Sequence, residues 1–200
     1  MRLPSVLGFT QDLIGQALTE GDVAIDATVG NGHDTLYLAR CVGASGMVFG
    51  FDIQEAALEA ARSRILEAGL EAQTRLILAS HDTMADWLES YVPGRRVRAV
   101  MFNLGYRPGG DRSKITRPET TLPALDTALQ LLSSGGLLTI VLYPGHPGGL
   151  VESEAVQEWV QSQILHCSSV LRYEFLNPKS PPPILLALVT QNDRSANLFD

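Results

Sequence analysis

The sequence predicts an α/β fold of the doubly wound class, in which helices cover both faces of a mostly parallel sheet. Apolar runs of strand length alternate with amphipathic stretches of helix length along the chain, a pattern typical of such folds. The 200 residues are 45% hydrophobic, enough for one domain with a substantial core. We find no internal repeat and no linker, so we expect one domain over 1–200 with a frayed polar tail at 191–200.

Seven apolar runs bounded by turn residues are the expected strands. Five should lie parallel, and they cover 22–27, 47–51, 74–79, 97–102 and 137–142. The run at 137–142 is the most apolar, which favours a central position in the sheet. Two further strands, 169–176 and 184–189, flank a proline-rich segment and should form a closing pair.

Helices are expected between these strands. Gly69 suits the C-terminal cap of one helix and Pro118 the first turn of another, while Asp82 or Thr83 can cap a short helix that ends at Tyr91. The turn Ser133-Ser-Gly-Gly136 should end the helix that Pro118 begins. The other expected helices cover about 9–20, 33–42, 54–68 and 152–167.

Composition and charge exclude several classes of protein. Cys41 and Cys167 have no metal-ligand spacing, so they are interpreted as small buried side chains in a reducing compartment, and no metal is expected. The chain has no charged leader and no apolar run long enough for a bilayer, which favours the cytoplasm and no membrane contact. A net charge of −7 argues against a protein coated with nucleic acid.

One loop differs from this acidic average. Between Leu104 and Arg117 the chain carries Arg107, Arg112 and Lys114 against a single acid, Asp111. Such a loop can bind an anionic substrate, although a solvated charged segment is the commoner case. Three further arginines precede the strand at 97–102 or begin it, and should lie at the opposite end of the sheet: Arg95, Arg96 and Arg98.

The strongest motif is Asp26-Ala-Thr-Val-Gly-Asn-Gly-His-Asp34, where the first strand should end and a helix begin. Ligands of doubly wound sheets bind outside the carboxyl ends of the strands. Gly30 and Gly32 permit a tight turn whose N–H groups can approach a ligand, and Asp26 adds a carboxylate. The third glycine of GxGxxG is missing, and Asp34 beside the helix start disfavours a pyrophosphate. A sulfonium cofactor fits better, with Gly30, Gly32 and Asp34 among its expected contacts, the alternative being an ordinary turn.

Carboxylates also end the next two strands. Asp52 stands where a carboxylate accepts hydrogen bonds from ribose hydroxyls, which suits either a nicotinamide cofactor or S-adenosylmethionine. His81-Asp82 follows the third strand, where a carboxylate can accept from the amine of adenine. Each acid alone could be a helix cap, but three at consecutive strand ends favour an adenosine site.

Two later loops supply candidate residues for the acceptor pocket. Asn103 can orient an attacking amine through its side-chain carbonyl, and Tyr106 can stack on a base, with an Asx turn and a packed tyrosine as the alternative. The segment Tyr143-Pro-Gly-His-Pro-Gly-Gly149 follows the fifth strand, where Tyr143, His146 and the nearby Glu152 can contact substrate.

These motifs together resemble one known family. The segments at 26–35, 50–54, 102–111 and 143–149 occur in the order found in the MnmM (YtqB-type) methyltransferases, long labelled rRNA methylases, and the similarity covers nearly the whole chain. The resemblance implies a Rossmann-like class I S-adenosylmethionine-dependent methyltransferase fold with a seven-stranded, mostly parallel sheet. It further implies transfer of a methyl group to the 5-aminomethyl nitrogen of the wobble 2-thiouridine in tRNA. The family's cofactor contacts would fall on Asp26, Asn31, Asp52, Gln54, His81 and Asp82.

The resemblance also completes the assignment of the acceptor side. The tRNA anticodon arm becomes the expected partner of the basic loop, with Arg107, Arg112 and Lys114 as its substrate contacts and a homodimer as a means of enlarging the basic surface. Asn103 would orient the amine and His146 or water would take its proton. The alternatives are a methyltransferase acting on rRNA or a small molecule, a nicotinamide-dependent oxidoreductase and a non-catalytic RNA-binding protein.

Overall fold

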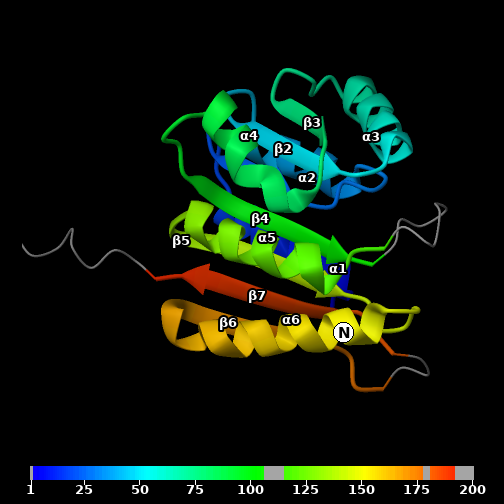
Figure 1. Ribbon diagram of the computed structural model, residues 1–200. Helices are drawn as coiled ribbons and strands as arrows, with labels where there is room; N and C mark the ends of the chain where they lie inside the picture. Colours follow the sequence, from blue (N-terminus) through cyan, green and yellow to red (C-terminus); the bar gives the residue numbers. More distant parts are fainter. Residues whose placement is uncertain (1, 106–114, 178–180, 192–200) are drawn as a thin grey trace, which may run out of the picture.

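The computed structural model describes residues 2–105, 115–177 and 181–191. Its seven strands are β1 (Val23–Asp26), β2 (Met47–Asp52), β3 (Thr74–Leu78), β4 (Val97–Leu104), β5 (Leu132–Leu142), β6 (Cys167–Tyr173) and β7 (Ile184–Thr190). They form one sheet in the order β3-β2-β1-β4-β5-β7-β6 (Figure 1). The first five strands are parallel, and β7 runs antiparallel to both β5 and β6. The prediction of a mostly parallel, seven-stranded sheet is therefore confirmed.

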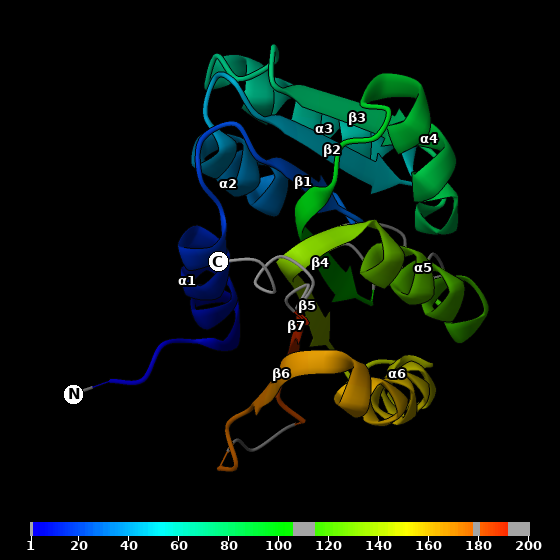
Figure 2. The same ribbon diagram turned by 90° about the vertical axis from the view of Figure 1, so that its left-hand side faces the viewer.

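Helices cover both faces of the sheet, as the alternating pattern predicted. One face carries α1 (Val6–Ala17), α2 (His33–Val42) and α3 (Glu55–Glu67), and the other carries α4 (Met84–Tyr91), α5 (Pro118–Leu131) and α6 (Gly149–Gln163). Figure 2, which views the sheet nearly end-on, separates the two layers. Short 3-10 turns, η1 (His81–Thr83) and η2 (Ile164–His166), precede α4 and follow α6.

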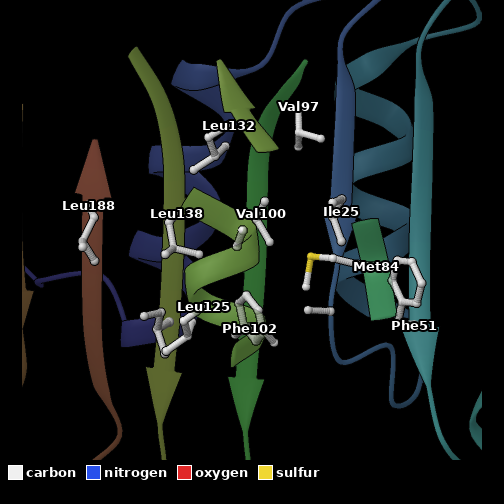
Figure 3. Close-up of a cluster of buried hydrophobic side chains, with 14 of the residues drawn as sticks. Ile25, Phe51, Met84, Val97, Val100, Phe102, Leu125, Leu132, Leu138 and Leu188 are labelled. Carbon is white, nitrogen blue, oxygen red and sulfur yellow. The ribbon is translucent and has the colours of Figure 1, made fainter. Parts of the chain in front are cut away.

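The core consists of side chains that alternate residues of each strand present to the two helical layers. Phe102 of β4 is 1% exposed and packs with Leu125 of α5 and Leu138 of β5 on the α4–α6 face (Figure 3). On the other face Ile14 of α1 packs with Leu38 of α2. The strands between them are apolar on both sides, which is typical of a parallel sheet covered twice.

The bounds of several elements differ from the sequence prediction. Strand β6 covers Cys167–Tyr173 rather than 169–176, and three other shifts have a local cause. Helix α1 begins earlier than expected because Ser5 caps it, its Oγ accepting from the N–H of Gly8 at 3.1 Å. Strand β5 begins at Leu132 rather than 137, since Thr190 of β7 takes up backbone groups of the expected turn, including the N–H of Gly136. Helix α6 begins at Gly149, after Gly148 in the left-handed conformation.

Two expectations from composition concern the cysteines and membrane contact. Cys41 and Cys167 are free thiols, as expected, but both are only half-buried. Within the described ranges, no helix combines the length and the apolar character needed to cross a membrane.

The strand β5 is internal to the sheet, as its apolar sequence predicted, although β4 holds the middle position.

The parallel register brings the carboxyl ends of four strands to one edge. Asp26 of β1 pairs with Gly50 of β2 and Met101 of β4, and Asp52 of β2 pairs with Leu78 of β3. The turn after β1 is fixed there by Gly32, whose φ is +76° and whose Cα faces helix α3 so closely that an added Cβ would lie 2.6 Å from the Cα of Ala61. This edge carries the candidate site.

Gly32→Ala tests this close approach. Gly69→Ala is the matched control, because Gly69 also has a positive φ, +68°, but has nothing within 4 Å of the Cβ position. We expect the control to lose about 1–2 kcal/mol of unfolding free energy from backbone strain. Gly32→Ala should lose about 1–3 kcal/mol more, because α3 must also shift. Urea denaturation of both variants measures the difference, and equal losses would contradict the packing of the turn against α3.

Candidate active site

Two cavities open at the carboxyl edge of the sheet, on either side of Asn103. The larger has a volume of about 690 Å³ and the smaller about 150 Å³, and Asn103 and Gly105 line both. The larger cavity is further lined by Leu7, Gln11, Val29, Asn31, His33, Asp34, Leu104, Tyr143, Gly145, His146, Pro181 and Pro183. The smaller is further lined by Ala27, Thr28, Phe51, Asp52, Ile53, Gln54, Ala79, Ser80, His81, Ile115, Thr116 and Thr120. The predicted site residues that line a cavity are thus divided between two adjoining spaces, and five others that the structure describes line neither: Asp26, Gly30, Gly32, Asp82 and Glu152.

Asp52 is the fixed acidic group of the smaller cavity. Its Oδ2 accepts from the N–H of Gly30 at 2.9 Å and its Oδ1 accepts from the N–H of Gln54 at 2.9 Å. Each carboxylate oxygen can accept a further hydrogen bond. The carboxylate is therefore oriented by backbone groups and still able to receive hydroxyl donors from a ligand in this cavity.

The glycine turn is closed by its own hydrogen bonds. Gly30 donates to Asp52, and the N–H of Gly32 donates to the carbonyl of Val29 at 2.8 Å. These two N–H groups, which the sequence analysis assigned to a ligand, are thus engaged within the protein. Asn31 between them lines the larger cavity, and its carbonyl accepts from Nε of Arg64 at 3.0 Å.

Asp26 lies beneath this turn and lines neither cavity. It is 0% exposed, and its carboxylate accepts from the N–H of Thr28 at 3.1 Å and from Oγ1 of Thr35 at 2.6 Å. Burial, with the negative charge of Asp34 as the next cause, raises the pKa of Asp26 to about 7. The structure therefore places Asp26 where it supports the loop between β1 and α2.

His81 and Asp82 carry unsatisfied polar atoms after β3. The imidazole of His81 is buried, with Nδ1 at 3.2 Å from the carbonyl of Ala27, and burial lowers its pKa. A carbonyl only accepts, so Nδ1 carries the proton and Nε2 is left as an acceptor. His81 Nε2 and Asp82 Oδ1 are buried and have no hydrogen-bond partner among the described residues. Both atoms are acceptors that a donor group of a ligand can satisfy.

Asn103 connects the two cavities through three hydrogen-bonding groups. Its main-chain N–H donates to Oγ1 of Thr28 at 2.7 Å, and its Nδ2 donates to Oδ2 of Asp34 at 2.7 Å. The other oxygen of Asp34 accepts from Nε2 of Gln11 at 3.2 Å. Asn103 Oδ1 is buried and has no partner within the described part of the chain. An acceptor is thus held at the boundary between the cavities.

Of the three predicted residues that follow β5, the two in the loop line the larger cavity and the third lies in α6. Burial, followed by the charge of Asp34, raises the pKa of Tyr143 to about 12, so the phenol stays protonated at neutral pH. Nδ1 of His146 lies 2.9 Å from the carbonyl of Pro147, which assigns the proton of the neutral ring to Nδ1. Glu152, in contrast, is 2% exposed and lines neither cavity. Its carboxylate accepts from Thr116 at 2.6 Å and Thr121 at 2.7 Å, and burial raises its pKa.

Four predicted residues lie outside the described ranges: Tyr106, Arg107, Arg112 and Lys114. The ends of their loop are described, since Gly105 and Thr116 both line the smaller cavity and the N–H of Thr116 donates to the carbonyl of Gly105 at 3.0 Å. At the opposite edge of the sheet, Arg95 donates to the carbonyl of Gly21. Arg96 and Arg98 also donate to backbone carbonyls there. Across the described ranges no cluster of three or more His, Cys, Asp or Glu side chains has the arrangement of a metal site.

Several residues that line the site were not predicted from the sequence. Gln11 and Leu7 come from α1, and Pro181 and Pro183 come from the segment before β7, yet all four line the larger cavity. Neither segment carries a chemical motif. Gln11 contacts Asp34 across 23 positions of the chain, so no local pattern announces the pair.

Known proteins similar to this chain are described as methylases or methyltransferases. Residues 48–189 match the family described as "Putative rRNA methylase". A chloroplastic tRNA (mnm(5)s(2)U34)-methyltransferase from Arabidopsis thaliana is 36% identical over 183 residues, which are 88% of this chain and 66% of the relative. A solved structure from Clostridium thermocellum, described as a "putative rRNA-methylase", is 40% identical with a TM-score of 0.89, over 95% of this chain and 100% of that one. Another, a "putative methyltransferase" from Streptococcus mutans in complex with SAH, is 35% identical with a TM-score of 0.82, over 95% and 99%.

The pKa of Asp26 predicts how stability depends on pH. The folded protein binds this proton more tightly than the unfolded chain, so its stabilisation is complete below the unfolded pKa of 3.8 and is lost as pH rises through about 7. Asp26→Asn keeps the shape but removes the titration. Between about pH 5 and about pH 8, the parent should lose about 2–3 kcal/mol of unfolding free energy relative to the variant. Denaturant titrations at both pH values measure this, and a pH-independent difference would contradict a raised pKa.

Proposed function

Because the chain belongs to the family described as "Putative rRNA methylase", a family of S-adenosylmethionine-dependent methyltransferases, we propose that it methylates the 5-aminomethyl nitrogen of the wobble 2-thiouridine in tRNA. The family resemblance of the motifs and the expected Rossmann-like methyltransferase fold are thereby confirmed. The tRNA substrate is supported by the activity named for the Arabidopsis relative, of which this chain spans 66%.

The smaller cavity has acceptor groups that match the hydrogen-bond donors of an adenosine. Asp52 offers carboxylate oxygens for ribose hydroxyls, and His81 Nε2 offers the exocyclic amine of adenine an acceptor that has no partner among the described residues. The next residue, Asp82, carries a second such acceptor, Oδ1, but does not itself line the cavity. Gln54 lies beside Asp52 in the same cavity wall. We assign the adenosine part of S-adenosylmethionine to these residues, with Asn31 and the larger cavity beyond the glycine turn for its amino acid part. When bound, the cofactor supplies a methyl group on a positively charged sulfur.

The observation that carries the proposal is the position of Asn103 between the two cavities. Its Oδ1, which has no partner among the described residues, can accept an N–H of the substrate amine, so that the nitrogen lone pair points away from Asn103. Methyl transfer is an in-line displacement, so alignment of the amine is the main task of the protein and can supply roughly 7–11 kcal/mol in favourable cases. Asn103 is therefore assigned as the residue that orients the amine.

The walls of the larger cavity supply the remaining functions. His146 is assigned as the proton acceptor, since a neutral ring with its proton on Nδ1 carries its lone pair on Nε2. Tyr143 stays protonated and can contact the uracil as a wall or a donor. Asp26 and Glu152 act as supports of the loops on either side, because their carboxylates are buried and bonded within the protein.

Other readings of the sequence receive less support. A nicotinamide-dependent oxidoreductase would share the sheet, but the family match and the SAH complex of a 35% identical structure favour methyl transfer. A methyltransferase acting on rRNA or a small molecule is the remaining alternative, distinguished by which substrate accepts the methyl group. The anticodon arm as partner, a homodimer and a cytoplasmic location stay predictions.

Two substitutions separate cofactor binding from orientation of the amine. Asp52→Ala should weaken S-adenosylmethionine binding by about 1.5–3 kcal/mol, the value of hydrogen bonds to a charged group. Asn103→Ala should leave that affinity nearly unchanged and lower kcat by about 100-fold, because the amine is misplaced. Calorimetry and single-turnover assays on tRNA carrying the aminomethyl group measure both. Equal effects of the two variants on cofactor affinity would contradict the division of the site.

Charge in the basic loop should govern tRNA binding. Neutralising Arg107, Arg112 and Lys114 together is expected to raise the KM for tRNA and flatten its dependence on salt, because counterion release falls with each lost phosphate contact. The control neutralises Arg95 and Arg96, whose guanidinium groups donate to backbone carbonyls at the opposite edge of the sheet. Steady-state kinetics per folded molecule at two salt concentrations compare them. A triple variant with the salt slope of the parent would place the tRNA elsewhere.

A further inference from the structure

We propose that Asp34 is a positioning residue whose carboxylate sets the orientation of the Asn103 amide and so determines that an oxygen, not an NH2 group, meets the substrate. This inference rests on the proposed function for the identity of the group that the oxygen receives. It gives Asp34 a role different from the cofactor contact that the sequence indicated.

Asn103 is held at both its main chain and its side chain. The main-chain N–H donates to Thr28 at 2.7 Å, and Nδ2 donates to Oδ2 of Asp34 at 2.7 Å. The first bond fixes where the residue lies at the end of β4. The amide group can rotate about the Cβ–Cγ bond. Among the hydrogen bonds described for this side chain, only the one to Asp34 restrains that rotation.

The chemistry of Asp34 decides which way the amide faces. The oxygen and nitrogen of an amide have nearly the same shape, so packing does not distinguish the two orientations. A carboxylate only accepts hydrogen bonds, so the NH2 group must face Asp34 and Oδ1 must face away. Without the carboxylate, the amide can rotate by half a turn and present a donor to the substrate amine, whose N–H groups it cannot accept.

Asp34 is itself fixed from a second helix. Its other oxygen accepts from Nε2 of Gln11 at 3.2 Å, and the carbonyl of Gln11 accepts from the hydroxyl of Tyr37 at 2.7 Å. Both oxygens of Asp34 are therefore engaged, and the carboxylate lines the larger cavity, whereas Asp52 lines the smaller. This arrangement suits an internal brace between α1, α2 and β4 better than a ligand of the adenosine.

A cycle of substitutions tests the polarity of the pair. Asp34→Ala should lower kcat by about 10- to 100-fold with little change in cofactor affinity. Asn103→Asp should also be impaired, because it sets two carboxylates against each other. In the double variant Asp34→Asn/Asn103→Asp, the introduced amide can donate to the introduced carboxylate, whose second oxygen again faces the cavity. We expect kcat of the double variant to exceed that of Asn103→Asp by about tenfold or more.

Two further measurements separate this role from general stability and from the identity of the substrate. Asp86→Ala is the control, since Asp86 is the acid in the first turn of α4 as Asp34 is in that of α2, and it is exposed. It should leave kcat unchanged. The side-chain amide protons of Asn103, followed by NMR without any substrate, should lose the shift of a hydrogen-bonded proton in Asp34→Ala.

The outcomes are distinct. A parent that fails on aminomethyl tRNA contradicts the proposed function, while the NMR signal still decides whether Asp34 holds the amide. The inference is overturned if Asp34→Ala leaves that signal unchanged, if the double variant shows no recovery, or if Asp34→Ala lowers cofactor affinity as much as turnover. The last result would make the carboxylate a cofactor ligand.

Discussion

The site depends on two carboxylates that hold the loop between β1 and α2 in place. Asp26 accepts from Thr28 and Thr35 at the two ends of the loop, and Asp52 accepts from Gly30 in its middle. Thr28 in turn accepts from the main chain of Asn103, so strands β2, β1 and β4 are joined through this one loop. The cavities lie where they do because these hydrogen bonds fix the loop. The loop is short, so loss of any one of these bonds would shift the groups that make the others.

These bonds also explain why three aspartates at the same edge of the sheet have different roles. Asp26, Asp34 and Asp52 all lie at the carboxyl edge, yet one is buried beneath the loop, one braces Asn103 and one faces the smaller cavity. The buried carboxylate has a raised pKa because water is excluded and negative charges lie nearby. A cationic cofactor suits such a site, because its positive charge is attracted by the three neighbouring acids.

Much of this arrangement could be predicted from the sequence, and the reason for the remainder is physical. Strand ends and glycine turns are local, so Asp52, His81 and Asn103 were placed correctly at the edge of the sheet. Whether an acid faces a ligand or the interior depends on partners far along the chain. Glu152 was predicted to meet substrate, but its carboxylate is buried and accepts from Thr116 and Thr121, which lie more than 30 positions away in the chain. Gln11 was missed for the same reason.

The main-chain hydrogen bond between Thr116 and Gly105 affects which changes of sequence the protein can tolerate. It joins the two ends of the segment 106–114 at the rim of the smaller cavity, so β4 and the approach to α5 are fixed independently of the residues between them. Segments with anchored ends tolerate insertion and exchange, since little closure entropy is added by a few more residues. Exchange of this segment would therefore leave the described residues of β4 and of the two cavities in place, so its sequence can change without altering the groups assigned to the cofactor and the amine.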